Sequence, residues 1–154
     1  MRYTLHFASL AEGRRQVVSW VLVRGGTVLL ERENARLGAP TSEFPRLMMR
    51  KALREAAKQE GIVDLTLSFD SSVSEIAFEL MGISEPDDKQ LDRTLRRVLR
   101  RLNSYKFAAA EYGEADATPA EAACIDNCLD QLEDLTTLKG VIKYYKTKFK
   151  EMFK

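Results

Sequence analysis

The chain has 154 residues, a formal net charge of +1, 45% hydrophobic residues and a mean hydropathy of −0.29. Its length suits one domain with a proper core, and its composition excludes a wholly disordered chain. No apolar run reaches the roughly 20 residues that a membrane span needs. The N-terminal segment lacks the apolar core of a signal peptide, and two cysteines make no disulfide framework, so we expect a cytoplasmic protein without membrane contact.

The charged side chains are distributed in blocks. Residues 1–85 carry equal numbers of acidic and basic side chains, and residues 86–106 have a net charge of +4. Residues 107–138 hold eight carboxylates and no Lys or Arg, whereas residues 139–154 hold six Lys and one Glu. Such blocks are typical of surfaces that meet charged partners or each other, although solvated helix faces give the same pattern.

Alternation of apolar and polar residues predicts three strands at the start of the chain. The Gly25-Gly26 pair is a hairpin signal between the second and the third. Thr41 or Ser42 can cap a helix that has Pro45 in its first turn and stops at Gly61. The strands expected here span residues 2–9, 16–23 and 27–33.

Helices and strands alternate in the rest of the chain. We expect strands at 64–70 and 104–112, and helices at 73–82, 91–101, 119–135 and 138–154. Ser71 or Ser72 is the expected cap of the first of these helices. The last helix is expected to cover its apolar side by docking on the acidic helix before it. That side is formed by Val141, Ile142, Tyr145, Phe149 and Met152.

The order of elements implies an α/β fold: a mixed five-stranded sheet, three antiparallel strands plus two parallel ones, flanked by helices. The segment TSEFPRLMMRKALREAAKQEGIVDLTLSFDSS, residues 41–72, resembles the core stretch of the ribonuclease H-like superfamily. There a loop enters the first helix, a Gly ends it, and a strand closes on an Asp-Ser pair. The opening YTLHFAS is similar to the family's first strand. The resemblance predicts a ribonuclease H-like domain at 1–135 and a basic C-terminal helix at 136–154.

The resemblance implies a phosphodiester-cleaving site in which acidic side chains hold two divalent cations about 4 Å apart. Asp70 fits the acid at the end of the fourth strand. The acid expected on the first strand is replaced by Ala8, and the Glu expected on the first helix is replaced by Arg46. For the acid on the last helix of the family, Glu121 and Asp126 fit about equally.

These replacements oppose metal binding, because Ala8 removes a ligand and Arg46 adds positive charge where the cations should sit. We therefore expect no working nuclease and no cofactor, with Asp70 either a catalytic remnant or a helix cap. The alternative is a divergent nuclease that uses Mg or Mn, held by Asp70 together with Glu43, Glu121 or Asp126.

A second family pattern covers part of the same helix. Residues 54–62 (REAAKQEGI) resemble the end of the Nudix box of magnesium-dependent diphosphate hydrolases. Lys58 and Gln59 replace the metal-binding glutamates, and Pro40 and Arg46 stand where a Gly and a Glu are expected. An ordinary amphipathic helix explains the segment as well, so a degenerate Nudix hydrolase is a remote alternative.

The two cysteines suggest no metal site. Cys124 and Cys128 lie four residues apart on one helix face, and no His or further Cys stands near them in the sequence to complete a zinc site. We expect both to be small buried core residues.

Arginines give the strongest remaining functional signal. Helix 91–101 has an apolar side, and its other side carries Arg93, Arg96, Arg97, Arg100 and Arg101. Five arginines on one face can neutralise several phosphates, and in the ribonuclease H family a basic helical region after the fourth strand helps to grip the duplex. We predict a non-catalytic domain that binds nucleic acid through this helix. The alternative is a protein-interaction module, such as a homo-oligomer held by the acidic and lysine-rich C-terminal segments.

Overall fold

The computed structural model describes residues 1–109 and 119–152. The elements in chain order are β1 (Arg2–Glu12), β2 (Arg15–Arg24), β3 (Thr27–Leu37), α1 (Glu43–Ala57), β4 (Asp64–Phe69), the 3-10 turn η1 (Ser71–Val73), α2 (Ser74–Leu80), α3 (Lys89–Leu99), β5 (Ser104–Ala109), α4 (Pro119–Asp134) and α5 (Leu138–Met152). One sheet has the strand order β3-β2-β1-β4-β5, antiparallel from β1 to β3 and parallel from β1 through β4 to β5. The predicted α/β class and mixed five-stranded sheet are confirmed.

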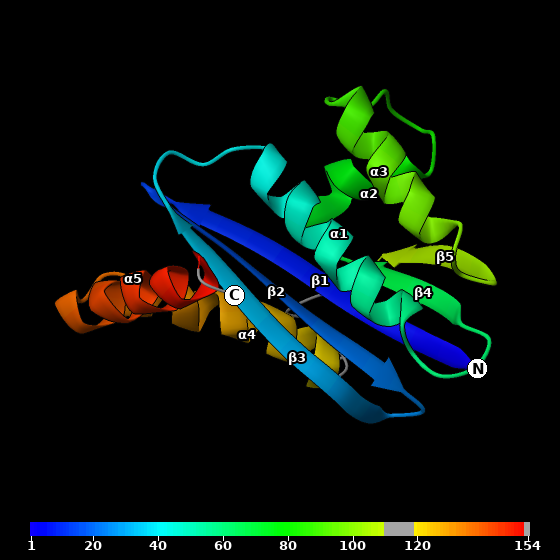
Figure 1. Ribbon diagram of the computed structural model, residues 1–154, viewed down its shortest axis with the longest axis horizontal. Coiled ribbons are helices and arrows are strands. Elements are labelled where there is room, and N and C mark those ends of the chain that lie inside the picture. Colours follow the sequence, from blue (N-terminus) through cyan, green and yellow to red (C-terminus); the bar gives the residue numbers. More distant parts are fainter. Residues whose placement is uncertain (110–118, 153–154) are drawn as a thin grey trace.

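The two faces of the sheet bury separate apolar clusters, because successive side chains of a strand point to opposite faces. Phe7 and Trp20 stack on the face covered by α1, α2 and α3, with their ring centroids 6.0 Å apart. Ala8 and Val21 belong to the other cluster, which α4 covers (Figure 1). The sheet therefore separates α1 and α3 from α4 and α5.

The hairpin between β2 and β3 has the turn that the sequence predicts. Gly25 and Gly26 both have positive φ, 56° and 80°, and they connect the paired residues Arg24 and Thr27. Two positive φ values in a two-residue loop match the twist of the flanking strands, and glycine adopts them without steric cost.

Several predicted boundaries were wrong. β3 continues to Leu37, four residues past its expected end, because residues 34–37 pair with β2. The first helix ends at Ala57, four residues before Gly61. Asp70, not Ser71 or Ser72, caps the turn after β4. The predicted residues 110–112 of β5 lie outside the described part of the chain.

α5 docks with a side other than the predicted one. The Tyr144 hydroxyl accepts a hydrogen bond from the Leu37 backbone N–H at 3.2 Å, and Lys148 Nζ donates to Asn34 Oδ1 at 3.0 Å. These contacts hold α5 against the edge strand β3. Most of the predicted apolar stripe is exposed instead, with exposed fractions of 60% for Tyr145 and 78% for Met152. None of the helices described here has the length and hydropathy that a membrane crossing needs.

Candidate functional site

Asp70 stands directly after β4 and caps η1. Its Oδ1 accepts a hydrogen bond from the Ser72 backbone N–H at 3.0 Å and a further, short one from the Ser72 hydroxyl. The Ser72 hydroxyl in turn accepts from the Ser9 backbone N–H at 3.1 Å, which ties this turn to β1. Burial raises the pKa of the Asp70 carboxyl, and the hydrogen bonds from Ser72 oppose that rise. Asp70 therefore caps η1 in the described structure, and its role as a catalytic remnant stays a prediction.

Ala8 is the neighbour of Asp70 on the adjacent strand. The parallel register ends on the pair Phe7 and Phe69, and Ala8 and Asp70 are the residues that follow these two along the chain. Ala8 is fully buried, and its carbonyl accepts from the Cys128 thiol at 3.6 Å. An apolar surface thus occupies the position beside Asp70 where the resemblance places a second carboxylate.

Arg46 is buried in an ion pair with a residue that the sequence analysis did not identify. Its guanidinium donates to both carboxylate oxygens of Glu79 in α2, and the two side chains are only 4% and 5% exposed. Arg46 Nη1 also donates to the Ser42 carbonyl at 2.7 Å, and Glu75 lies 3.9 Å away at the surface. The positive charge of Arg46 is therefore neutralised between α1 and α2.

Of the other candidate acids, the structure describes the side chains of Glu43 and Asp126. Glu43 is exposed in the first turn of α1, and Asp126 is exposed on α4, two residues from each cysteine and so on the opposite side of that helix. The side chain of Glu121, also on α4, lies outside the described residues. Within the part of the chain that the structure describes, no three His, Cys, Asp or Glu side chains are placed to hold a metal ion. The described donors around Asp70 do not fit a pair of divalent cations.

Two thiols take the inner side of α4 instead. Cys124 donates to the His6 carbonyl at 3.3 Å, and both cysteines are fully buried and free, as the sequence predicts. Burial raises the pKa of Cys124 to about 12 and raises that of Cys128 as well, and the charge of Asp70 adds to both shifts. Cys124 and Cys128 are therefore neutral core residues that close the space next to Asp70.

Asp88 caps α3 by accepting hydrogen bonds from the backbone N–H groups of Gln90 and Leu91, both at 3.0 Å.

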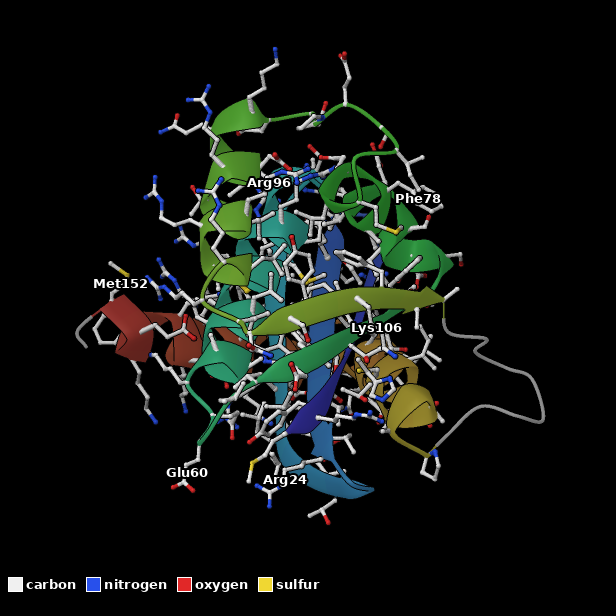
Figure 2. All side chains as sticks on the ribbon, turned by 90° about the vertical axis from the view of Figure 1, so that its right-hand side faces the viewer. Arg24, Glu60, Phe78, Arg96, Lys106 and Met152 are labelled. Atoms are coloured by element: carbon white, nitrogen blue, oxygen red, sulfur yellow. The ribbon has the colours of Figure 1, made fainter. Side chains whose placement is uncertain are left out.

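The arginines of this helix divide into two groups. Arg96 turns toward α2: its Nε contacts Asp92 Oδ2 at 2.8 Å, and its Nη2 donates to the Glu79 carbonyl at 2.8 Å. The others are exposed, and Figure 2 shows blue guanidinium tips on the outer side of α3 and Arg96 between α3 and α2. The exposed group consists of Arg93 and Arg97 on α3, Arg100 at its C-cap and Arg101 directly after it, and these four are the α3 arginines. The helix itself ends at Leu99, two residues before its predicted end.

Comparison with solved structures identifies the fold. The ribonuclease H1 of the halophilic archaeon Halobacterium salinarum NRC-1 matches with a TM-score of 0.63 and 23% identity, over 84% of this chain and 98% of that one. The N-terminal ribonuclease H domain of a Mycobacterium tuberculosis protein matches with a TM-score of 0.62 and 14% identity, over 82% and 97%. The ribonuclease H1 LC11, solved with an RNA/DNA hybrid, matches with a TM-score of 0.53 and 13% identity, over 82% and 99%.

The chain has a ribonuclease H-like fold. No protein-family model matches the sequence, and no curated protein matches it either. Only residues 54–57 of the Nudix-like segment belong to α1, and Lys58 and Gln59 lie past the last residue of that helix.

The acidic and basic C-terminal segments of this ribonuclease H-like domain meet at the edge of the sheet. Glu33 of β3 lies where α4 and α5 come together, and burial raises the pKa of its carboxyl. The nearby Lys143 of α5 lowers that pKa, whereas Asp134 and Asp130 of α4 raise it. The positive charge of Lys143 on α5 is therefore partly balanced by the Glu33 carboxylate of β3 in the same chain. Pairing of these segments between chains stays a prediction.

Proposed function

We propose that this ribonuclease H-like domain binds nucleic acid through the exposed arginines of α3 and does not cleave it. The observation that carries the proposal is that four exposed arginines form no salt bridge within the described residues: Arg93, Arg97, Arg100 and Arg101. Arg96, in contrast, contacts Asp92 and the Glu79 carbonyl. A guanidinium that has no internal partner can neutralise a phosphate and release its counterion. The free thiols of Cys124 and Cys128 suit a reducing, cytoplasmic location.

The non-catalytic part of the proposal is supported by the surroundings of Asp70. Two-metal cleavage needs several carboxylates that converge on the cations. Asp70 is engaged by Ser72, Ala8 supplies no ligand, and Arg46 is held by Glu79. We accordingly expect no metal cofactor.

Fluorescence anisotropy with a labelled DNA duplex and an RNA–DNA hybrid tests the binding. Four phosphate contacts from α3 give a slope of log K against log salt of about −3.6 on duplex DNA. The triple variant Arg93→Gln, Arg97→Gln, Arg100→Gln removes three of them and should make the slope shallower by about 2.7. A matched control removes three exposed lysines of α5 by Lys139→Gln, Lys146→Gln and Lys150→Gln, with the same change in net charge. Equal effects of both triple variants would refute a role for α3.

Incubation of the same hybrid with Mg²⁺ or Mn²⁺ tests the absence of cleavage. We expect the hybrid to stay intact. Cleavage that disappears in Asp70→Asn would overturn the non-catalytic proposal and establish the divergent nuclease. Cleavage that persists in that variant would point to a contaminating enzyme, and a repeat after further purification should then leave the hybrid intact.

A further inference from the structure

We infer that α1 supplies a second row of cations beside the arginines of α3, and that the two helices together form a binding face for a nucleic-acid duplex, recognised through its phosphates without regard to sequence. The inference rests on the proposed function and extends it. The α1 row consists of Lys51 and Arg54 on α1 and of Lys58, the C-cap residue directly after it. Lys51 and Lys58 are exposed, and Arg54 is half-buried. None of the three forms a salt bridge within residues 1–109 and 119–152.

The two rows lie on the same side of the molecule. α1 and α3 cover the same face of the sheet (Figure 1), and both contribute to the cluster that contains Met49 and Leu95. Helices in contact have axes about 8–10 Å apart. The step from Lys51 to Lys58, like that from Arg93 to Arg100, covers seven residue rises, or roughly 10 Å along the helix axis. Cations on two neighbouring helices can contact the phosphates on both sides of a duplex groove, which is about 6–12 Å wide.

Acidic side chains on α1 do little to reduce this charge. Glu55 contacts Arg32 of β3 at 3.3 Å and so directs its carboxylate toward the strand edge. Glu43 stands at the opposite end of α1 from Arg54 and Lys58. The exposed carboxylates of α4 lie behind the other face of the sheet, among them Asp126, Asp130, Glu133 and Asp134. A polyanion is therefore attracted by α1 and α3 and repelled by α4, which orients its approach.

The face suits a duplex rather than a single strand. Proteins that bind single strands stack the bases on aromatic side chains, in addition to contacting phosphates. α3 contains no aromatic residue, and the one aromatic residue of α1, Phe44, is buried at 7% exposure. The face thus offers charge without a stacking surface, and phosphate contacts alone carry no sequence information.

Anisotropy titrations of the full chain from 50 to 200 mM salt test the inference. Seven cations give a slope of about −6.3 on duplex DNA, against about −3.6 for α3 alone. The variant Lys51→Gln, Arg54→Gln, Lys58→Gln should make the slope of log K against log salt shallower by about 2.7. The ratio of the parent's affinity to that of the variant should therefore fall about 40-fold between 50 and 200 mM salt. The α5 triple variant, Lys139→Gln, Lys146→Gln, Lys150→Gln, should keep the parent slope. Circular dichroism and the midpoint of thermal unfolding check that each variant is folded.

Each outcome separates the two proposals. If the α3 variant loses binding and the α1 variant keeps the parent slope, the proposed function stands and the two-helix face is wrong. If neither variant differs from the parent, both proposals fail. Two duplexes of unrelated sequence should bind within about twofold of each other, and a single strand of the same length should bind more weakly than either. A single strand that binds more tightly than the duplexes would overturn the choice of ligand.

Discussion

The buried pair of Arg46 and Glu79 predicts a large loss of stability when one partner is removed. Glu79→Ala leaves the Arg46 guanidinium inside the protein without the carboxylate that accepts two of its hydrogen bonds. Breaking a pair that is this deeply buried typically costs about 3–5 kcal/mol, because one charge stays desolvated without compensation. Glu75, 3.9 Å from Arg46 and largely exposed, can recover part of that cost, so we expect about 3 kcal/mol.

Urea denaturation followed by circular dichroism measures this cost by linear extrapolation. A loss of 3 kcal/mol corresponds to a drop in the thermal midpoint of about 6–12 °C for a domain of this size. A cost below about 1 kcal/mol, the range of solvent-exposed ion pairs, would refute the reasoning, since it would mean that water reaches the pair.

A double substitution provides the matched control. In Arg46→Met with Glu79→Leu, neither charge of the pair is left buried. The double variant should therefore be more stable than Glu79→Ala, by about 3 kcal/mol or more. Arg46→Met, Glu79→Leu and the double variant complete a double-mutant cycle. If their changes in the free energy of unfolding are strongly non-additive, the cost belongs to the pair rather than to lost packing. Additive effects would assign it to packing.

Three further predictions concern single groups. Burial raises the pKa of Asp70 in the folded state, so its stabilising contribution is fully present below its ordinary pKa of 3.8 and is lost as the pH rises through the folded pKa. Asp70→Asn keeps an acceptor for Ser72 and should therefore be more stabilising at pH 7 than at pH 3 in urea denaturation. A thiol with a pKa of about 12 is protonated at pH 8, so a thiol reagent should modify Cys124 and Cys128 only after denaturant is added, and rapid labelling of the native chain would contradict their burial. Removal of the α3 cap by Asp88→Ala should cost about 1 kcal/mol in urea denaturation, whereas Asp88→Asn should retain most of the stability, and equal losses would argue against the cap.

The elements that the sequence predicts best are those with strong local patterns. The alternation around Phe7, the Gly25-Gly26 turn and the arginine-rich helix are properties of a few neighbouring residues, and each was found close to its expected position. The end of β3 was missed because its residues pair with β2 across the sheet, a contact that outweighs their preference for a loop.

The candidate site shows the same division between local and distant contacts. The expectation that Asp70 closes the fourth strand depends on neighbouring residues only, and the structure has Asp70 directly after β4. Glu79 was missed because it meets Arg46 from 33 residues away, and no spacing in the sequence joins the two. The prediction of which side of α5 docks was wrong, because several sides of this helix carry apolar or aromatic residues. The hydrogen bond between Tyr144 and Leu37 fixes which of them faces β3.

The Arg46–Glu79 pair also constrains how this chain can change over time. A single replacement of Arg46 by Glu would put two carboxylates together at a buried position and remove the cation that neutralises Glu79. The intermediate would be unstable before it could gain a metal ligand, and Ala8 would still lack one. Building a carboxylate cluster among the described residues around Asp70 would therefore require coordinated changes on β1, α1 and α2, because the packing of the helices opposes each single step.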